Sequence, residues 1–389
     1  MKICYIASVV ELPPHSGSGT GGATHAFEIA NNLARKGHIV NIICKKSFSK
    51  QDVYEKINDN IRVFRMFSWL GRTYKFFSSK KIAWKIARPF YYSFRSIIHA
   101  FHLIMFLSRN KCDVIYERCT KSNFSGFLAT ILLRKPYFLE INDFCYPKVL
   151  LHFAKKIITP NKLLIPEFAR EKVVELQWGA NTDIFRPDID SENIKIKHNL
   201  KDKKVIIHVG SSMDWHGIND IIKSASLISF EYPDIVFVIV GGGDITAYKT
   251  KVKESNLEDK FVFTGYINYK EIPSYLSAAD IALAPYTSEL NKESNRALFA
   301  SPLKIFEYMA SGKPLITTTI ANLNNLVKNE ENGIVIPADS PENIVSAIDK
   351  LLKNPYLRKK LGTNARREAI EKYSWQKHTD LLENALELV

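Results

Sequence analysis

The stretch SPLKIFEYMASGKP, residues 301–314, is the most informative part of this chain. Ser301 and Pro302 are typical of a helix start, because serine caps free N–H groups and proline fits the first helical turn. Gly312 predicts the end of that helix. The apolar run LITTT follows at once and predicts a strand. A helix between a capped start and a following strand is therefore expected here.

The same helix carries two polar side chains that suit a nucleotide diphosphate. Lys304 lies in the expected first turn, where the free N–H groups and the helix dipole favour an anion. Glu307 lies about a turn and a half inside the helix. We expect its carboxylate to accept hydrogen bonds from two hydroxyls of a ribose.

This segment closely resembles the nucleotide-sugar site of glycosyltransferase family 4, a group of retaining enzymes. The resemblance implies that Glu307 binds the donor ribose, and that the helix start holds the diphosphate through Ser301, Pro302, Leu303 and Lys304. The alternative is a capped amphipathic helix in an unrelated α/β protein. Fourteen matching residues between a loop and a strand favour the family.

Short apolar strands alternate with helical segments along both halves of the chain, which predicts parallel sheets. A polar segment at 178–204 separates the halves. The resemblance implies the GT-B architecture, in which two Rossmann-like α/β domains face a cleft. We expect an acceptor- and membrane-facing domain at 1–187, a nucleotide-sugar domain at 203–365, and a C-terminal helix at 366–389 that packs back on the first domain. The predicted strands are KICYIASV, HIVNIICK, CDVIYER, YFLEIND, KKIITPN, KVVELQW, KVIIHVG, IVFVIVGGG, KFVFTGY, ADIALAPY, PLITTT and GIVIP.

The bulk composition is that of a globular protein of 389 residues, long enough for two domains. No apolar run reaches the roughly 18 residues that span a bilayer, and no small-residue cleavage site follows the first strand. We therefore expect a cytoplasmic location. The five cysteines lack C-x2-C spacing and an accompanying histidine cluster, so reduced thiols are expected and a zinc site is not.

Basic and aromatic residues are concentrated at 62–111, which carries eleven lysines and arginines and no acidic residue. That composition is typical of a surface that lies in the headgroup layer of an anionic membrane. We therefore predict peripheral attachment to the inner face of the cell membrane. Nucleic acid is the rival partner, but no recognisable nucleic-acid module accompanies the stretch. The remaining alternative places many of the aromatic residues in the core.

The glycine-rich loop GSGTGG fits G-x-G-x-x-G through Gly17, Gly19 and Gly22, which allows an NADP site as one interpretation. A dinucleotide loop follows its strand directly, however, and here ELPPHS intervenes. The resemblance instead implies that Gly21 and Gly22 let the backbone approach the donor phosphates. His25, just inside the next helix, is assigned to the acceptor side.

The segment VGSSMDWHG matches the family's first loop of the donor domain, through Gly210, but departs from it in two places. The resemblance leads us to expect an arginine and a lysine that contact the diphosphate, where this chain has Ser211 and His216. Both are assigned to the donor site nevertheless. A third departure is Phe299, where the family's E-x7-E pattern has a glutamate. These departures keep open the possibility of an inactive relative.

Polar residues end two strands of the first half. The resemblance places Asn142 where many members have a histidine that touches the donor sugar, and Glu140 and Asp143 beside it are further candidates for contacting the sugar or acceptor. A strand-end turn of polar residues is the alternative. Glu117 and Arg118 also end a strand, and a pair between them is expected.

The resemblance and these residues together predict a retaining glycosyltransferase without a metal or other cofactor. The expected donor is a nucleotide-diphosphate sugar with UDP as the expected nucleotide, and the expected acceptor is a lipid-linked or growing cell-surface glycan. Lys304, Glu307 and Asn142 are the catalytic candidates, while Gly265 and Tyr266 are assigned to the base. No Asp-x-Asp metal clamp is assigned to the site. The alternatives are an inactive nucleotide-sugar- or membrane-binding relative and, more weakly supported, an NADP-dependent oxidoreductase.

Overall fold

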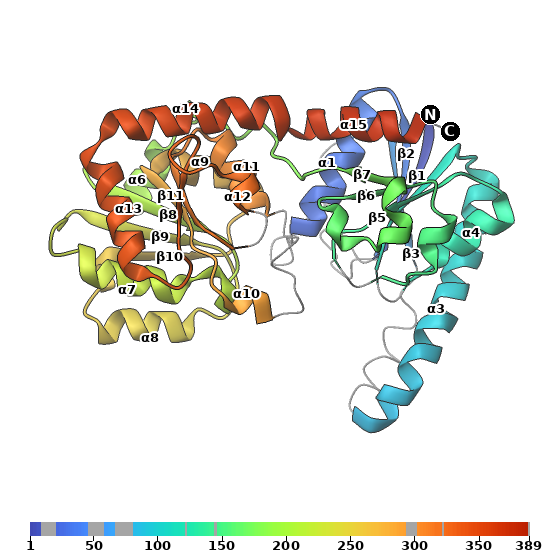
Figure 1. Ribbon diagram of the computed structural model, residues 1–389, viewed down its shortest axis with the longest axis horizontal. Helices are drawn as coiled ribbons and strands as arrows, with labels where there is room; N and C mark the ends of the chain where they lie inside the picture. Colours follow the sequence, from blue (N-terminus) through green and yellow to red (C-terminus); the bar gives the residue numbers. More distant parts are fainter. Residues whose placement is uncertain are drawn as a thin grey trace. The chain divides into compact units, whose positions relative to one another are not determined.

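The computed structural model describes residues 1–8, 21–45, 58–66, 81–120, 123–143, 146–292, 302–320 and 323–387. The chain divides into two compact units (Figure 1). The first unit comprises Met1–Gln177 and Thr379–Val389, and the second comprises Trp178–His378. Each unit is built around one parallel sheet with helices packed against it.

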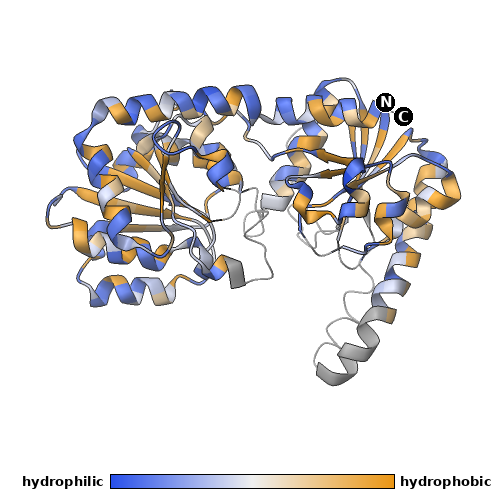
Figure 2. Cartoon of the chain, in the orientation of Figure 1, coloured by the Kyte–Doolittle hydropathy of each residue, from blue (hydrophilic) through white to orange (hydrophobic). Residues whose placement is uncertain are grey.

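The first unit contains a seven-stranded sheet in the order β3-β2-β1-β4-β5-β6-β7, so the strand order reverses between β1 and β4. Its strands are β1 (Lys2–Ala7), β2 (Ile39–Lys45), β3 (Ile61–Met66), β4 (Val114–Arg118), β5 (Tyr137–Glu140), β6 (Lys156–Thr159) and β7 (Val173–Glu175). Its helices are α1 (Gly21–Arg35), α3 (Lys81–Arg109), α4 (Ser125–Leu133) and α5 (Leu150–Phe153), with short 3₁₀ turns η1 (Lys162–Leu164) and η2 (Glu167–Lys172). Hydrophobic residues are concentrated in the strands of this sheet (Figure 2).

Strand β3 was not predicted from the sequence. It pairs with β2 in parallel register, from Val40 opposite Ile61 to Lys45 opposite Met66. Two arginines in its run IRVFRM hide the apolar pattern of a strand. Such a mixed pattern suits its place at the edge of the sheet, where Arg62 is exposed.

The second unit contains a six-stranded parallel sheet in the order β10-β9-β8-β11-β12-β13, which reverses between β8 and β11. All six of its strands were predicted. They are β8 (Lys204–Val209), β9 (Ile235–Val240), β10 (Phe261–Gly265), β11 (Ile281–Ala284), β12 (Leu315–Thr318) and β13 (Ile334–Ile336). The helices are α6 (Glu192–Lys197), α7 (Ile218–Ile228), α8 (Thr246–Glu254), α9 (Ile272–Ala278), α10 (Glu289–Lys292), α11 (Leu303–Ala310), α12 (Leu323–Leu326), α13 (Pro341–Lys353) and α14 (Pro355–Lys372), with 3₁₀ turns η3 (Asp214–His216), η4 (Glu258–Lys260) and η5 (Tyr269–Glu271).

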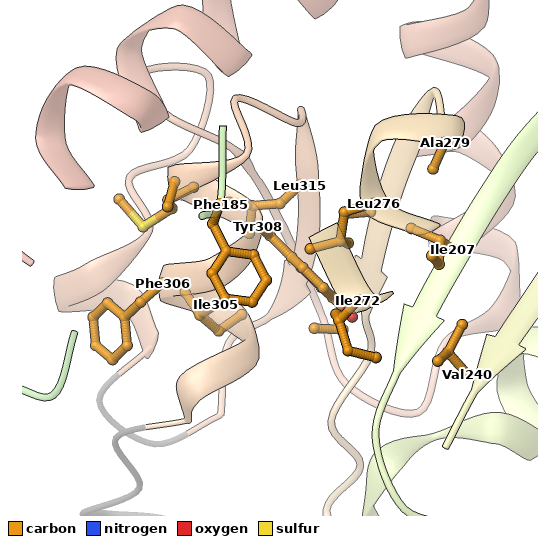
Figure 3. Packing of buried hydrophobic residues seen from close by; sticks show 14 of the residues in the cluster. Phe185, Ile207, Val240, Ile272, Leu276, Ala279, Ile305, Phe306, Tyr308 and Leu315 are labelled. Atoms are coloured by element: carbon orange, nitrogen blue, oxygen red, sulfur yellow. The ribbon is translucent and has the colours of Figure 1, made fainter. Parts of the chain in front are cut away.

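Helix α11 corresponds to the segment from which the sequence analysis began, and it is anchored by its apolar face. Ile305, Phe306 and Tyr308 are fully buried in the core shown in Figure 3. The Tyr308 hydroxyl also accepts a hydrogen bond from the Val209 N–H at 2.7 Å, which fixes α11 against the end of β8. Gly312 ends the helix with φ +65°, as predicted. The polar groups of α11 are thus held on a rigid element.

The C-terminal helix α15 (Trp375–Glu387) begins in the second unit and ends in the first. In the first unit its Glu383 accepts hydrogen bonds from Lys36 and His38, each at 2.6 Å, and Asp380 pairs with Lys36 at 2.8 Å. These contacts confirm the prediction that the last helix crosses back to the first domain. Among the described residues, no helix has both the length and the apolar character needed to cross a membrane.

Candidate functional site

The glycine loops of the second unit lie side by side at the carboxyl ends of β8, β9 and β10, and the loop after β8 borders the point where the strand order reverses. Gly210 follows β8, and its N–H donates to the Val240 carbonyl at 2.8 Å. The Gly241 N–H donates to the Gly265 carbonyl at 3.0 Å, which joins the loops after β9 and β10. Ligands of open α/β sheets bind outside the carboxyl ends of strands at such a reversal. The structure therefore brings the predicted donor-loop glycines to the position where a ligand is expected.

Close backbone packing explains why glycine occupies the loop after β9. Gly241 has φ +148°, and a Cβ there would lie 1.7 Å from the Gly210 carbonyl oxygen. Tyr266, which follows β10, packs beside Gly242 and stays partly exposed. Any side chain at position 241 would push the loop after β9 away from the loop at Gly210. Ser211 lies next to Gly210 and is exposed.

Lys304 is the most unusual residue of this site. It lies in the first turn of α11, yet its side chain is only 9% exposed, and its Nζ has no hydrogen-bond partner among the described residues. The amine is next to Gly210, where an added Cβ would be 2.5 Å from Nζ, and it lies 5.1 Å from the centre of the Tyr286 ring. Burial lowers the pKa of Lys304 to about 7, against the opposing effect of Glu307. An anion is the partner that such an amine lacks.

Two histidines lie near the Lys304 amine, and only one of them was predicted from the sequence. His216, in η3, donates a hydrogen bond from Nδ1 to the Ser211 carbonyl at 2.7 Å. His208, in β8, is 1% exposed and was missed because the run KVIIHVG is otherwise an ordinary buried strand. Its imidazole is 6.0 Å from that of His216, between ring centres. A polar residue one position before the end of an apolar strand was the available signal.

The remaining donor-site candidates lie at the start of α11 or one turn along it. Pro302 precedes the helix, and Leu303 is its first residue. Glu307 is buried, and its charge acts on the Lys304 amine. Ser301 and Phe299 lie outside the described residues, so the expected serine cap has no structural account.

In the first unit, the predicted acceptor-side residues converge on Glu140, at the end of β5. His25 Nδ1 lies 3.4 Å from its Oε1, and the Asn142 side-chain amide donates to the same oxygen. Oε2 accepts a hydrogen bond from the Tyr5 hydroxyl at 2.9 Å. Arg118 completes the network, 3.3 Å from Glu140 and 2.6 Å from His25. Because both oxygens of Glu140 are occupied, this buried carboxylate orients its neighbours.

The predicted pair between Glu117 and Arg118 is wrong. Successive residues of a strand point to opposite faces of a sheet, so these neighbours on β4 cannot meet. Arg118 stands opposite Glu140 in the register of β4 and β5, whereas Glu117 accepts hydrogen bonds from the Tyr137 hydroxyl and the Gly126 N–H. Burial raises the pKa of Glu117 to about 7.

Helix α1 begins at the predicted glycine pair, with Gly21 exposed and Gly22 half-buried. Asp143 is exposed after β5. Gly17 and Gly19, on which the NADP interpretation depends, lie outside the described residues. The sequence does contain one Asp-x-Asp triplet, DID, whose first residue Asp188 is exposed and pairs with Arg186 at 3.2 Å.

Comparison with known proteins gives consistent matches. Residues 190–368 match the family model described as glycosyl transferases group 1. The chain is 24% identical to an uncharacterized glycosyltransferase of Methanocaldococcus jannaschii, with 96% of this chain and 95% of that protein covered. It is also 24% identical to the UDP-Gal:alpha-D-GlcNAc-diphosphoundecaprenol alpha-1,3-galactosyltransferase of Escherichia coli, with 89% and 88% covered. The crystal structure of Anabaena HepE in complex with UDP has a TM-score of 0.74 at 15% identity, covering all of both chains. The two parallel-sheet, Rossmann-like units thus have the GT-B fold, as expected.

Proposed function

The chain belongs to the group 1 glycosyltransferases, and we propose that it is a retaining enzyme that uses a UDP-linked sugar as donor. The acceptor that we propose is a lipid-linked or growing cell-surface glycan. One observation carries the donor assignment. A buried lysine amine, which has no hydrogen-bond partner among the residues that the structure describes, lies beside the glycine loop at the reversal point of the donor-domain sheet.

In the proposed donor complex, different residues of the second unit bind the diphosphate, the ribose and the base. Lys304, the Ser211 hydroxyl and the N–H groups of the loop at Gly210 bind the diphosphate, together with Pro302 and Leu303 at the start of α11, and His216 orients that loop through its hydrogen bond to the Ser211 carbonyl. Glu307 accepts two hydrogen bonds from the ribose. Gly265 and Tyr266 contact the base, which the exposure of the Tyr266 ring allows. These groups fix the donor so that its anomeric carbon leaves the diphosphate in a defined direction.

The proposed reaction depends mainly on stabilisation of the leaving diphosphate and little on general acid–base catalysis by side chains. As the bond from the anomeric carbon to the phosphate oxygen breaks, negative charge develops on the diphosphate next to Lys304 and the loop N–H groups. The acceptor hydroxyl attacks the same face of the sugar, and the departing phosphate oxygen takes its proton. In this proposal the charge is neutralised by groups of the chain itself, without a metal.

We assign the acceptor side to the first unit. Asn142, which donates to Glu140, and His25, which accepts from Arg118, offer hydrogen-bonding groups to sugar hydroxyls together with Asp143. The Escherichia coli relative acts, by its name, on a sugar attached to diphosphoundecaprenol. That name supports a lipid-linked acceptor for this chain.

Calorimetry with UDP and NADP tests the donor assignment. We expect UDP to bind and NADP to bind at least about 100-fold more weakly, because Glu307 and Lys304 form a site for one ribose and one diphosphate. Tighter binding of NADP would contradict the assignment and favour the oxidoreductase alternative. UDP binding without product formation would favour the inactive relative, which the replacement of two cations by Ser211 and His216 keeps as the second candidate.

The described part of α3 supports attachment to an anionic membrane. Its exposed apolar residues recur at intervals of three or four and so form one stripe along the helix; they are Phe90, Phe94, Ile97, Phe101 and Met105. Helix α4 packs against α3 and adds the exposed Ile131 and Leu132. Basic residues flank the stripe at Arg95, Arg109 and Lys111. The side chains of the other basic residues at 65–88 lie outside the described part.

Serine at both Phe94 and Phe101 is expected to release the protein from vesicles that contain phosphatidylglycerol. Each inserted ring contributes about 1.5 kcal/mol or more, so the double variant should partition about 100-fold more weakly. Flotation of the full chain on a density gradient measures the effect. Phe230→Ser is the matched control, because Phe230 is 97% exposed in the second unit.

The parent protein should also float much less with neutral vesicles, because its basic residues contribute about 1 kcal/mol each near an anionic surface. UDP affinity should be the same in the parent protein, in the double variant at Phe94 and Phe101, and in Phe230→Ser. The membrane proposal is wrong if the parent stays at the bottom of the gradient with anionic vesicles, or if Phe230→Ser matches the effect of the double variant.

A further inference from the structure

Three nitrogen atoms of the second unit converge on the open side of Gly210. A Cβ built on this glycine would lie 2.5 Å from Lys304 Nζ, 3.3 Å from His208 Nε2 and 3.3 Å from His216 Nδ1. The three side chains come from α11, β8 and η3, of which α11 is far from the other two in sequence. Glycine at position 210 therefore lets three groups that can carry positive charge approach the backbone closely.

Hydrogen bonds fix the tautomer of both imidazoles in their neutral form. His208 Nδ1 lies 3.0 Å from the Leu283 carbonyl oxygen, and His216 Nδ1 lies 2.7 Å from the Ser211 carbonyl oxygen. A carbonyl oxygen only accepts, so each Nδ1 carries the proton and each Nε2 carries a lone pair. His208 Nε2 is buried and has no partner among the described residues. His208 Nε2 is therefore a hydrogen-bond acceptor near the Lys304 amine, which also has no hydrogen-bond partner among the described residues.

Beside Gly210, none of these three groups holds a full positive charge above pH 7 in the absence of a ligand. Burial lowers the pKa of Lys304 to about 7 and that of His216 to about 3, and it places the pKa of His208 well below its ordinary value. Glu307, on α11, opposes the shift of Lys304. Among the described residues, the other titratable groups beside these three are the phenols of Tyr286 and Tyr308, whose pKa values burial raises, so both are neutral.

We propose that the Lys304 amine forms a diphosphate subsite that takes up one proton from solvent when the donor binds, and that His208 is the positioning residue that accepts a hydrogen bond from the resulting Lys304 ammonium. The inference rests on the proposed function, since it concerns the same donor site. It explains how a chain with Ser211 and His216 at the two cation positions still binds a diphosphate. The cation is formed at Lys304 when the anion arrives.

The proton uptake makes donor affinity depend on pH in one direction. The diphosphate favours the ammonium, so the pKa of Lys304 is higher in the complex than in the free protein. Binding is therefore strongest below the free value of about 7 and weakens as pH rises above it. Near pH 8 we expect uptake of about one proton per UDP, and a Kd that rises about tenfold for each further pH unit.

Calorimetry of UDP binding to the full chain, in buffers with different enthalpies of ionisation, counts these protons. At pH 8 the phosphates of UDP are themselves fully ionised, because their last pKa is about 6. Uptake near one proton supports the proposal. UDP binding with no proton uptake and a constant Kd between pH 6.5 and 8.5 overturns it and leaves the proposed function intact. No UDP binding at any pH overturns the proposed function itself.

His208→Phe tests the positioning role through its pH profile. Without the acceptor, the free ammonium is less favoured, so UDP should bind about tenfold more weakly at pH 8 but nearly as well at pH 6, where Lys304 is already protonated. His198→Phe is the matched control, because His198 is partly buried against Tyr275 and should show no change at either pH. An equal loss for His208→Phe at both pH values contradicts the positioning role. If the variant does not fold, the proton count of the parent protein still decides the proposal.

Discussion

Replacing Glu307 by glutamine is expected to weaken UDP binding by about 100- to 10,000-fold. In the proposed complex the Glu307 carboxylate accepts two hydrogen bonds from the ribose, and each charge-assisted bond contributes about 1.5–3 kcal/mol. Glutamine keeps the volume of a buried side chain, so the fold of α11 should persist. Calorimetry with UDP measures the loss. Glu254→Gln, on the exposed face of α8, is the control.

A second ligand separates the ribose contact from a general disturbance of the site. Inorganic pyrophosphate carries the diphosphate charges without a ribose, so Glu307→Gln should bind it about as well as the parent does. An unchanged affinity for UDP in Glu307→Gln would show that the ribose assignment is wrong. Equal losses for UDP and pyrophosphate would instead point to an indirect effect through Lys304.

Replacing Lys304 by methionine is expected to lower turnover by about 10- to 1,000-fold, the range for one group that stabilises a leaving anion. Methionine fills the space of the lysine stem. Since the Lys304 amine is buried and has no hydrogen-bond partner in the described part of the chain, its removal should leave the thermal midpoint unchanged or raise it. Steady-state kinetics and thermal unfolding together test both statements. Unlike Glu307→Gln, this variant should also lose affinity for pyrophosphate.

An exposed lysine provides the control for this variant. Lys251 lies on α8 and contacts Asn219 at the surface, so Lys251→Met should turn over like the parent. EDTA should not change the activity of any of these proteins. Turnover by Lys304→Met within about twofold of the parent would contradict the role of the amine, and loss with EDTA that manganese restores would contradict the proposal that no metal takes part.

The fold was largely predictable because its signals are local. The strands of the second unit are continuous apolar runs, and Gly312 marks the end of α11 with a backbone angle that favours glycine. Strand β3 was missed because it lacks such a local signal. Arg62 and its neighbours, at the edge of the sheet, do not form an apolar run. Local pattern thus predicts buried elements better than edge elements.

The candidate site was predictable only in part because its contacts are not local. His208 could be read as an unremarkable strand residue until the structure placed its imidazole beside Lys304, about a hundred positions away. Arg118 was paired with its chain neighbour, whereas strand register places it opposite Glu140. Residue roles that depend on cross-strand register or on convergence of distant elements need the folded structure.

Sugar transfer in the presence of EDTA tests the central claim most directly. The full chain is incubated with a panel of α-linked UDP-sugars and a polyprenyl-diphosphate-linked N-acetylhexosamine, and mass spectrometry measures the products. We expect one donor to be consumed with release of UDP, and its sugar to be added to the acceptor with the α configuration retained. A folded chain that binds UDP but neither transfers nor hydrolyses any donor sugar would contradict the account.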